Sequence, residues 1–251
     1  MLAIHPPLVY HRDVTTKFFR FALRTTDVEG ARAFYAAVLG DRRASIWPLH
    51  ENAIARGARP HWLGSLGVED LERALAAFVD RGATPLGPSY APAEGGQAAN
   101  LRDSGGAVVS LATRPGVETE SPANAVHVSW HVLNTNDAPR AVKTYADICG
   151  WEFTEVVDLG APGIFQQFGW HPGGANIGAI ADIAARPGVH SHWLFFFEVD
   201  ALDLALARVR EGGGVVVEIA RMPNGPRYGV CDDPQGAAFG LRERLPAPAQ
   251  G

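Results

Sequence analysis

The chain of 251 residues has little of what marks disulfide-rich, membrane-spanning or nucleic-acid-binding proteins. Its two cysteines, Cys149 and Cys231, lack paired spacing, so we expect two buried thiols in a reducing compartment. No apolar run approaches the roughly 18 residues that a membrane helix needs. The formal net charge is −5 and the basic residues form no stripe, which argues against a nucleic-acid partner. The first 17 residues lack the layout of a signal peptide, so we expect a cytoplasmic protein.

The chain does contain an internal repeat, and a repeat of this length determines how all other features of the sequence are interpreted. Residues 18–40 (FFRFALRTTDVEGARAFYAAVLG) correspond to residues 128–150 (VSWHVLNTNDAPRAVKTYADICG). The matching pairs, each 110 residues apart, are Asp27 and Asp137, Tyr35 and Tyr145, and Gly40 and Gly150. The repeat predicts two copies of one module, and a hydrophobic content of 47% is enough to give both a core.

Each copy predicts the same order of elements. Alternating residues predict a first strand (17–25 and 125–135), and an aspartate then caps a helix that ends at a glycine. The sequences HWLGSLGV (61–68) and HWLFFFEV (192–199) predict a later strand in each copy. The other predicted elements are a helix that follows Glu69 or Asp70 and ends at Gly82, a helix at 201–210, and strands at 98–101, 107–112, 153–158, 164–170 and 175–181.

The expected domains are a lead-in (1–16), a first module (17–113), a linker (114–124), a second module (125–243) and a C-terminal tail (244–251). The spacing between copies rises from 110 at the first helix to 131 at the HWL strand. The second copy therefore has 21 more residues between these points. These residues predict a full hairpin around Gly173, which is reduced in the first copy.

This order, the phrase SWHVLNTNDAPRAVKTYADICGW from Ser129 to Trp151, and the DPQG turn at 233–236 resemble the vicinal oxygen chelate superfamily of glyoxalases, bleomycin resistance proteins and extradiol dioxygenases. The chain is most similar to its two-module, glyoxalase-like members. The resemblance implies an α+β fold of two tandem βαβββ modules, a pseudo-dimer with curled, cup-shaped mixed sheets. It implies no single chemistry, because one fold hosts many.

In metal-dependent members of this superfamily, histidine or glutamate ligands lie on the first strand, on the strand before the second helix, and on the last strand. The corresponding positions here are Arg20, Leu63 and Ser110 in the first copy, and Trp130, Leu194 and Gly240 in the second. None of these side chains is a usual ligand for the divalent metals that polarise substrate oxygens. We therefore expect no metal cofactor of the family type.

Two histidines keep other possibilities open. His61 and His192 precede the expected ligand positions by two residues, so they share the same strand face. They could build a displaced metal site, bind a ligand by hydrogen bonds, or stand at a strand entrance without a chemical role. His127, His131, His171 and His190 are expected to be surface or interface residues.

Alternation predicts which side chains share the concave face of each sheet. In the first copy they are Arg20, Ala22, Arg24, Leu63, Ser65, Val108 and Ser110; in the second, Trp130, Val132, Asn134, Leu194, Phe196, Ala238 and Gly240. The second set suits an aromatic small-molecule pocket, unless Trp130 packs between the modules. Arg20 must pair with something if it faces inward, either with a ligand carboxylate or phosphate or with Asp200 or Glu198.

The sequence therefore predicts a metal-independent protein, related to glyoxalases and bleomycin resistance proteins, that sequesters or senses a small aromatic or hydrophobic molecule. The candidate ligand-binding residues are Arg20, His61, Ser110, Trp130, Asn134, Phe196 and His192. The alternative is a lyase, isomerase or dioxygenase with a displaced His-based metal site. No nucleic acid or membrane is expected as a partner. We expect a monomer that acts as an internal pseudo-dimer, with a homodimer through exposed sheet edges left open.

Overall fold

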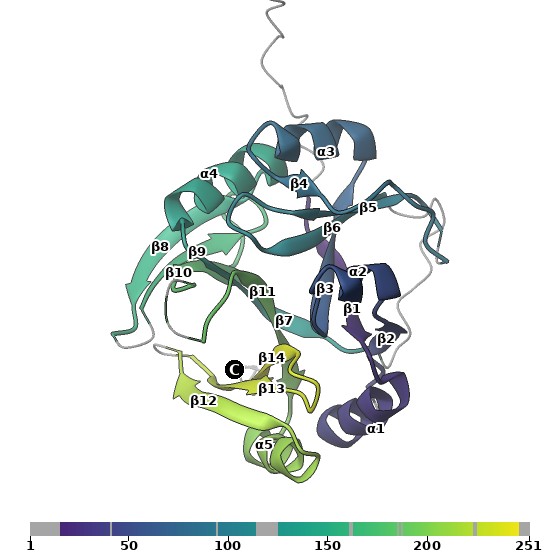
Figure 1. The fold of residues 1–251 in the computed structure, drawn as a ribbon. Coiled ribbons are helices and arrows are strands. Elements are labelled where there is room, and N and C mark those ends of the chain that lie inside the picture. Colours follow the sequence, from purple (N-terminus) through teal and green to yellow (C-terminus); the bar gives the residue numbers. More distant parts are fainter. Residues whose placement is uncertain are drawn as a thin grey trace, which may run out of the picture.

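The computed structural model describes residues 16–40, 42–93, 95–113, 125–160, 163–184, 186, 188–222 and 225–245, which form two mixed sheets with helices outside them (Figure 1). The predicted linker, and all but one or two residues of the lead-in and the tail, lie outside the described residues. No helix among the described residues is long and apolar enough to cross a membrane.

The first half of the chain forms a six-stranded sheet. Its elements in chain order are β1 (Phe18–Thr25), α1 (Val28–Leu39), β2 (Ser45–Pro48), α2 (Glu51–Ala55), β3 (His61–Val68), α3 (Leu71–Val79), β4 (Thr84–Pro85), β5 (Ala98–Arg102) and β6 (Val108–Thr113). Asp27 and Asp70 cap α1 and α3 by accepting hydrogen bonds from first-turn amides, which have no partner within a helix. The apolar stripe of α1, formed by Ala31, Phe34, Tyr35, Val38 and Leu39, is buried as a whole.

The second half forms an eight-stranded sheet. Its elements are β7 (Val128–Thr135), α4 (Ala138–Cys149), β8 (Glu152–Asp158), β9 (Ile164–Gly169), β10 (Gly178–Asp182), β11 (His192–Val199), α5 (Leu202–Glu211), β12 (Val215–Arg221), β13 (Arg227–Asp232) and β14 (Ala238–Glu243). Asp137 caps α4 as predicted, and Gly150 ends it in the left-handed conformation with φ 70°. Both cysteines are buried free thiols, as expected.

The sheets have equivalent centres. The strand orders are β2-β1-β3-β6-β5-β4 and β12-β13-β14-β11-β7-β10-β9-β8. In each sheet the first strand pairs antiparallel with the HWL strand, which pairs parallel with the last strand. The second sheet holds two βαβββ units, β7-α4-β8-β9-β10 and β11-α5-β12-β13-β14, whereas the first holds one complete unit from β3 to β6 and a reduced unit from β1 to β2. The first copy thus has fewer strands than the second in the region where the sequence analysis expects a reduced hairpin.

Several elements were missed or misplaced by the sequence analysis. Strands β2, β4, β12 and β13 and the short helix α2 were not predicted. The spacing of Leu71, Leu75, Phe78 and Val79 predicts that they share one buried face of α3, but Val79 is 41% exposed. Helix α3 ends at Val79, with Asp80 as its C-cap, three residues before Gly82. Val79 therefore stands at the end of the helix, and the apolar spacing does not show where a helix ends.

The two halves meet across a shared aromatic core. Phe18 of β1 contacts the rings of His131, Trp151, Trp193 and Phe195, all from the second half. Figure 1 shows α1 beside α5 at one end of this interface and α3 beside α4 at the other. The interface therefore has two related ends that can be compared residue by residue.

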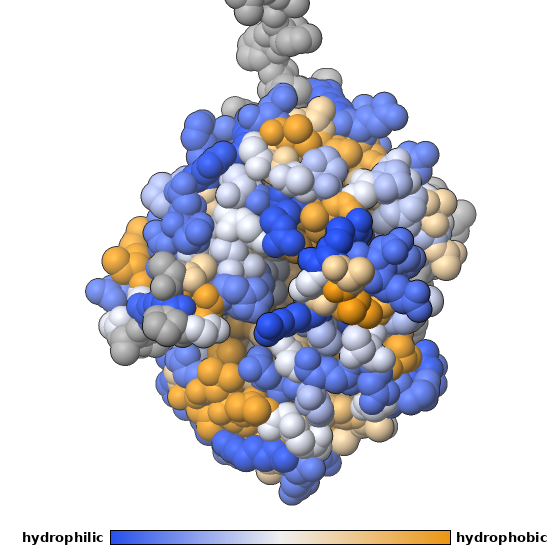
Figure 2. Space-filling model, in the orientation of Figure 1, coloured by the Kyte–Doolittle hydropathy of each residue, from blue (hydrophilic) through white to orange (hydrophobic). Residues whose placement is uncertain are grey.

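Strand β12 is one edge of the larger sheet and carries exposed apolar side chains. Val215, Val217 and Ile219 are exposed by 57%, 61% and 47%, and they form the hydrophobic patch at the lower left of Figure 2. Strand β12 thus combines a sheet edge with an exposed apolar face. A homodimer formed through a sheet edge would use a surface of this kind.

Candidate functional site

The concave face of the first sheet, which we call cup one, contains a cavity of about 260 Å³. Its lining residues are Arg20, Ala22, Arg24, Trp47, Leu63, Ser65, Tyr90, Ala91, Pro92, Ala93, Ala98 and Ser110. All but one of the side chains predicted for this face are among them, and Val108 is the exception. The structure thus brings together Arg20 and Ser110, which the sequence placed on strands far apart in the chain.

Strand register explains the polar row across the floor of cup one. Arg20 on β1 lies opposite Ser65 on β3, and Ser65 lies opposite Ser110 on β6. Neighbouring strands are about 4.8 Å apart, so the guanidinium and two hydroxyls are neighbours on one face. Ser65 and Ser110 are buried at 8% and 2% exposure, which leaves their hydroxyls directed at the cavity or at one another.

Arg24 is the second cation of cup one. It is partly buried, and it makes no ion pair or hydrogen bond with any residue that the structure describes. The described residues that line the cavity include no carboxylate. A partly buried guanidinium favours an anionic partner, so cup one suits a ligand that supplies negative charge.

His61 lies opposite Arg24 at the entrance of β3. Its Nδ1 donates to the Arg59 carbonyl oxygen at 2.7 Å, because a carbonyl can only accept. Burial lowers the pKa of His61, and the positive charges of Arg24 and Arg102 lower it further. His61 therefore presents a neutral imidazole beside Arg24, and its Nε2 has no hydrogen bond to a described residue, but the ring is not among the residues that line the cavity.

Two aromatic side chains form the outer wall of cup one. Trp47 on β2 is 41% exposed and Tyr90 in the loop before β5 is 38% exposed. The Tyr90 hydroxyl donates to Asn100 Oδ1 at 3.5 Å. The sequence analysis missed both, because they come from segments in which the two copies of the repeat are not aligned.

The concave face of the second sheet, cup two, is filled by its own side chains. Trp130 and Phe196, both predicted ligand-binding residues, lie at 8% and 3% exposure in an apolar cluster with Tyr228. A Cβ added at Gly240 would lie 2.2 Å from the Phe196 ring, so this ring covers the small residues of the last strand. Cup two therefore has aromatic rings in the volume that is open in cup one.

Repeat positions show why the cups differ. Trp130, Phe196 and Tyr228 of cup two stand where cup one has Arg20, Ser65 and Ala98, respectively. Phe196 and Tyr228 meet edge to face with centroids 5.7 Å apart. Two small residues and one cation in the first copy thus correspond to three rings in the second.

Asn134 and His192 meet at one end of cup two. His192 Nδ1 donates to the His190 carbonyl at 2.7 Å, so its Nε2 accepts from Asn134 Nδ2 at 3.4 Å. Burial lowers the pKa of His192 to about 4, so this ring is neutral near pH 7. Asn134 Oδ1 is buried with no hydrogen-bond partner among the described residues.

The metal-ligand positions of the family can now be tested against the geometry. Arg20, Leu63 and Ser110 do converge in one cavity, but they supply a guanidinium, an alkyl group and a hydroxyl. Trp130 and Leu194 lie in the filled cluster of cup two, with Gly240 under Phe196. Across the described part of the chain, no three His, Cys, Asp or Glu side chains are grouped so that they could hold a metal ion. The residues present do not fit a divalent metal.

The acids considered as internal partners of Arg20 are engaged elsewhere. Glu198 and Asp200 both pair with Arg244, at 2.6 and 3.0 Å. His131, expected at a surface or interface, lies in the interface core at 4% exposure.

Comparisons with known proteins agree with this architecture. Residues 124–241 match the family model of the Glyoxalase/Bleomycin resistance protein/Dioxygenase superfamily. A protein named "Putative glyoxylase CFP32" from Mycobacterium bovis is 28% identical over 240 residues, which cover 94% of this chain and 89% of that protein. The protein of the same name from Mycobacterium tuberculosis gives the same figures.

Solved structures extend the likeness to both halves. The 2,3-dioxygenase LapB from Pseudomonas sp. KL28 superposes with a TM-score of 0.61 at 14% identity, covering 93% of this chain and 94% of that one. The Mn(II)-bound glyoxalase from Novosphingobium aromaticivorans gives a TM-score of 0.57 at 13% identity, with 92% and 83% covered. At such identities these structures show the fold alone.

The fold with its paired cups is that of the two-module vicinal oxygen chelate proteins, and the second half of the chain, which matches the family model, resembles the glyoxalase, bleomycin resistance protein and dioxygenase superfamily.

Proposed function

We propose that this protein binds a small organic anion with a flat apolar body in cup one, without a metal ion, and that it sequesters or senses that molecule. The observation that carries the proposal is a cationic cavity at the place where the family builds its metal site. Arg20 occupies the first-strand ligand position, and Arg24 lies four residues further along β1 on the same face.

The chemistry of the cavity favours a carboxylate. A guanidinium offers parallel N–H groups that match the two oxygens of a carboxylate, and the Ser65 and Ser110 hydroxyls can donate to either oxygen. In metal-dependent relatives a cation polarises ligand oxygens, and here fixed guanidinium groups supply positive charge in a similar place. Trp47 and Tyr90 at the wall suit a ring or another flat apolar group.

The enzymatic alternative needs a metal site built from His61 and His192. Each of these histidines is tied to a backbone carbonyl through Nδ1 and borders a different cup. The relative is named a glyoxylase, but among the described residues no three His, Cys, Asp or Glu side chains are grouped so that they could hold a metal ion. Binding is therefore the function that the site supports best.

The proposed site is complete within one chain. Every residue that lines cup one comes from the first module, between Arg20 and Ser110. The filled cup two stiffens the second module through its ring cluster instead of holding the same ligand. We propose that the protein works as a monomeric pseudo-dimer.

Calorimetric titration of the full chain with benzoate and with neutral benzamide tests the proposal. Benzoate should bind more tightly than benzamide, and Arg24→Gln should weaken benzoate binding about tenfold, since hydrogen bonds to charged groups contribute about 1.5–3 kcal/mol. Ser65→Phe places in cup one the residue that fills cup two, and it should remove binding of both probes.

The matched control is Arg56→Gln, which removes an exposed arginine of the same module outside the cavity. It should leave benzoate affinity unchanged. Equal affinities for Arg24→Gln and Arg56→Gln would contradict a cup-one site. Loss of binding after chelation and its return on adding a divalent metal would contradict the metal-free mode.

A further inference from the structure

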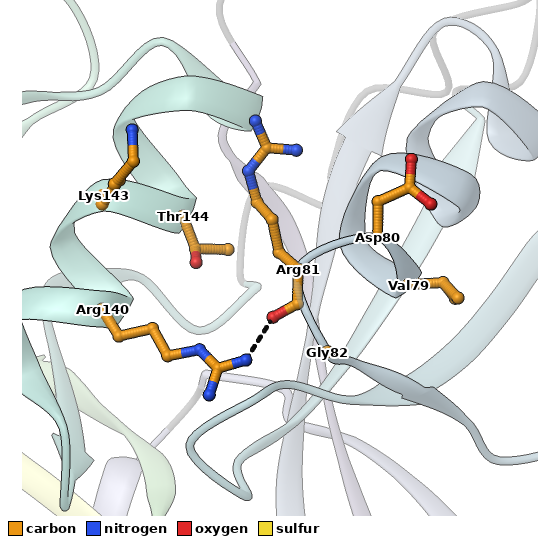
Figure 3. A pocket seen from close by; sticks show the side chains of 7 residues that line it. All are labelled: Val79, Asp80, Arg81, Gly82, Arg140, Lys143 and Thr144. Carbon is orange, nitrogen blue, oxygen red and sulfur yellow. Dashed lines mark hydrogen bonds between the residues drawn. The ribbon is translucent and has the colours of Figure 1, made fainter. Parts of the chain in front are cut away.

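The cations around a cavity between α3 and α4 serve the contact between the modules. This cavity of about 420 Å³ is bordered by Arg81, Arg140 and Lys143 (Figure 3). Asp147 pairs with both Arg81 and Lys143, at 3.4 and 3.0 Å. The Arg140 guanidinium lies apart from these head groups, where its Nη2 donates to the Arg81 carbonyl oxygen at 2.9 Å. Cup one differs, because two arginines of a single strand line one cavity there.

Arg20 and Arg24 lie at opposite ends of cup one. They are four residues apart on one face of β1, so their Cα atoms are about 13 Å apart. The Arg20 guanidinium lies over the ring of the preceding residue, Phe19, at 5.2 Å from its centroid, and thus on the side away from Arg24. Arg24 lies opposite His61, and its positive charge contributes to the lowered pKa of that imidazole. The two positive charges of the cavity are therefore separate.

The floor between the two arginines is apolar. Ala22 lies between them on β1, and Leu63 lies opposite Ala22 on β3. Both side chains are buried. Ser65 and Ser110 are in register with Arg20, so their hydroxyl groups belong to its end of the cavity. Along β1, cup one therefore has a cationic end lined by hydroxyl groups, an apolar middle and a second cationic end.

One carboxylate is too small to contact both arginines. A carboxylate oxygen lies about 2.8 Å from a guanidinium nitrogen that donates to it. The two guanidinium groups start from Cα atoms about 13 Å apart and are directed to opposite ends of the cavity. A monoanion therefore pairs with one arginine, whereas a ligand with an anionic group at each end pairs with both.

We infer that cup one is specific for a small dicarboxylate whose two carboxylates stand at opposite ends of a flat apolar body. This inference rests on the proposed binding function of cup one and adds a second charged group, held by the second arginine. The cavity of about 260 Å³ is smaller than the roughly 300–1,000 Å³ of sites for drug-sized ligands, so the apolar body is small, such as a single ring. Terephthalate, with carboxylates across a benzene ring from one another, has this shape.

Calorimetric titration of the full chain with terephthalate, phthalate and benzoate, at neutral pH and constant ionic strength, tests this inference. Terephthalate should bind about tenfold more tightly than benzoate, the gain expected from one further charge-assisted hydrogen bond. Phthalate carries the same charge on adjacent ring positions and cannot span the cavity, so it should bind no more tightly than benzoate. Equal affinities for terephthalate and phthalate would overturn the inference, because the site would then respond to charge alone.

Two variants locate the second carboxylate. Arg20→Gln should lower the affinity for terephthalate to that for benzoate, because one carboxylate loses its partner. Arg32→Gln removes an exposed arginine of α1 outside the cavity and should preserve the preference for terephthalate. A preference that persists in Arg20→Gln would contradict the two-ended site. If Arg20→Gln fails to fold by circular dichroism, the comparison of terephthalate with phthalate on the unaltered chain decides the question.

The outcomes separate this inference from the proposed function. Benzoate binding that depends on Arg24, with terephthalate binding no tighter, would refute the two-ended ligand and leave cup one as a site for monoanions. Absence of binding for all three probes would refute the proposed function itself.

Discussion

His131 is a neutral base held inside the module interface. Its Nδ1 donates to the Ile177 carbonyl oxygen at 2.9 Å, so Nε2 carries a lone pair and has no partner among the described residues. The rings of Phe18, Trp170 and Phe195 surround it. Burial lowers the pKa of His131 to about 4, and the positive charge of His127 acts in the same direction.

This shift predicts a pH dependence of stability. Between about pH 6.5 and pH 4 the unfolded chain binds a proton at His131 that the folded chain does not, so the free energy of unfolding falls as pH falls through this window. The full contribution, present above about pH 6.5, is about 3 kcal/mol. Urea unfolding of His131→Phe from pH 7.5 to pH 4.5 should show a pH dependence smaller by about this amount.

At neutral pH the same variant should lose only about 1 kcal/mol, because the Ile177 carbonyl also accepts the His131 amide at 3.0 Å and stays paired. His127→Gln alters an exposed neighbour and serves as the control. An unchanged pH slope in His131→Phe would assign the dependence to other groups, with His192 the first to test because its pKa is also lowered to about 4.

At the scale of elements, α1 and α4 are each joined to the opposite module by a buried tyrosine that makes two hydrogen bonds. On α4 the Tyr145 hydroxyl donates to Asp103 Oδ2 at 3.0 Å and accepts from Trp193 Nε1 at 3.2 Å. On α1, Tyr35 does the same with Asp233 and Trp62, at 3.3 and 2.9 Å. The Asp103 and Asp233 turns thereby join β6 and β14 to helices of the other module.

Tyr145→Phe should lower the free energy of unfolding by about 1–3 kcal/mol, because it leaves the buried Trp193 N–H without an acceptor. Chemical denaturation followed by circular dichroism measures this loss. Tyr90→Phe is the matched control, since its hydroxyl is at the surface and makes one long hydrogen bond. A loss for Tyr145→Phe no larger than that for Tyr90→Phe would mean that the set contributes nothing beyond packing.

At the scale of the whole molecule, the two modules share one core. The main buried cluster includes Leu23 and Phe78 from the first half and Phe168 and Phe239 from the second. Phe18, the first residue of β1, is in ring contact with five aromatic residues of the second half, which are His131, Trp151, Trp170, Trp193 and Phe195. Such a core predicts that the modules unfold together rather than in sequence.

Phe18→Ala should therefore lower the stability of the whole chain by about 3–5 kcal/mol within a single transition, since the cavity lies between the modules. Differential scanning calorimetry compared with tryptophan fluorescence checks this expectation. Two separated transitions, of which the substitution shifts only one, would show that the halves are independent domains.

Much of this fold was predictable from the chain alone, for local reasons. The aspartate caps, the terminating glycines and the apolar stripe of α1 depend on residues within one or two turns of each other, and the repeat confirmed their order twice. Strand β12 was missed because its exposed positions carry the apolar side chains of Val215, Val217 and Ile219, so the sequence shows no polar–apolar alternation although exposure along the strand does alternate.

The sequence by itself determined the family of fold, the absence of ligand-type residues at the family positions, and the faces that Arg20, Arg24 and Ser110 share, because alternation and internal spacing are local properties. Only the tertiary structure decided which cup is open. Cup two closes because Phe196 and Tyr228 come from strands 32 residues apart and meet edge to face. The contact between α3 and α4 likewise depends on Arg140 donating to the Arg81 carbonyl oxygen across the interface, and contacts between distant segments exist only once the chain has folded.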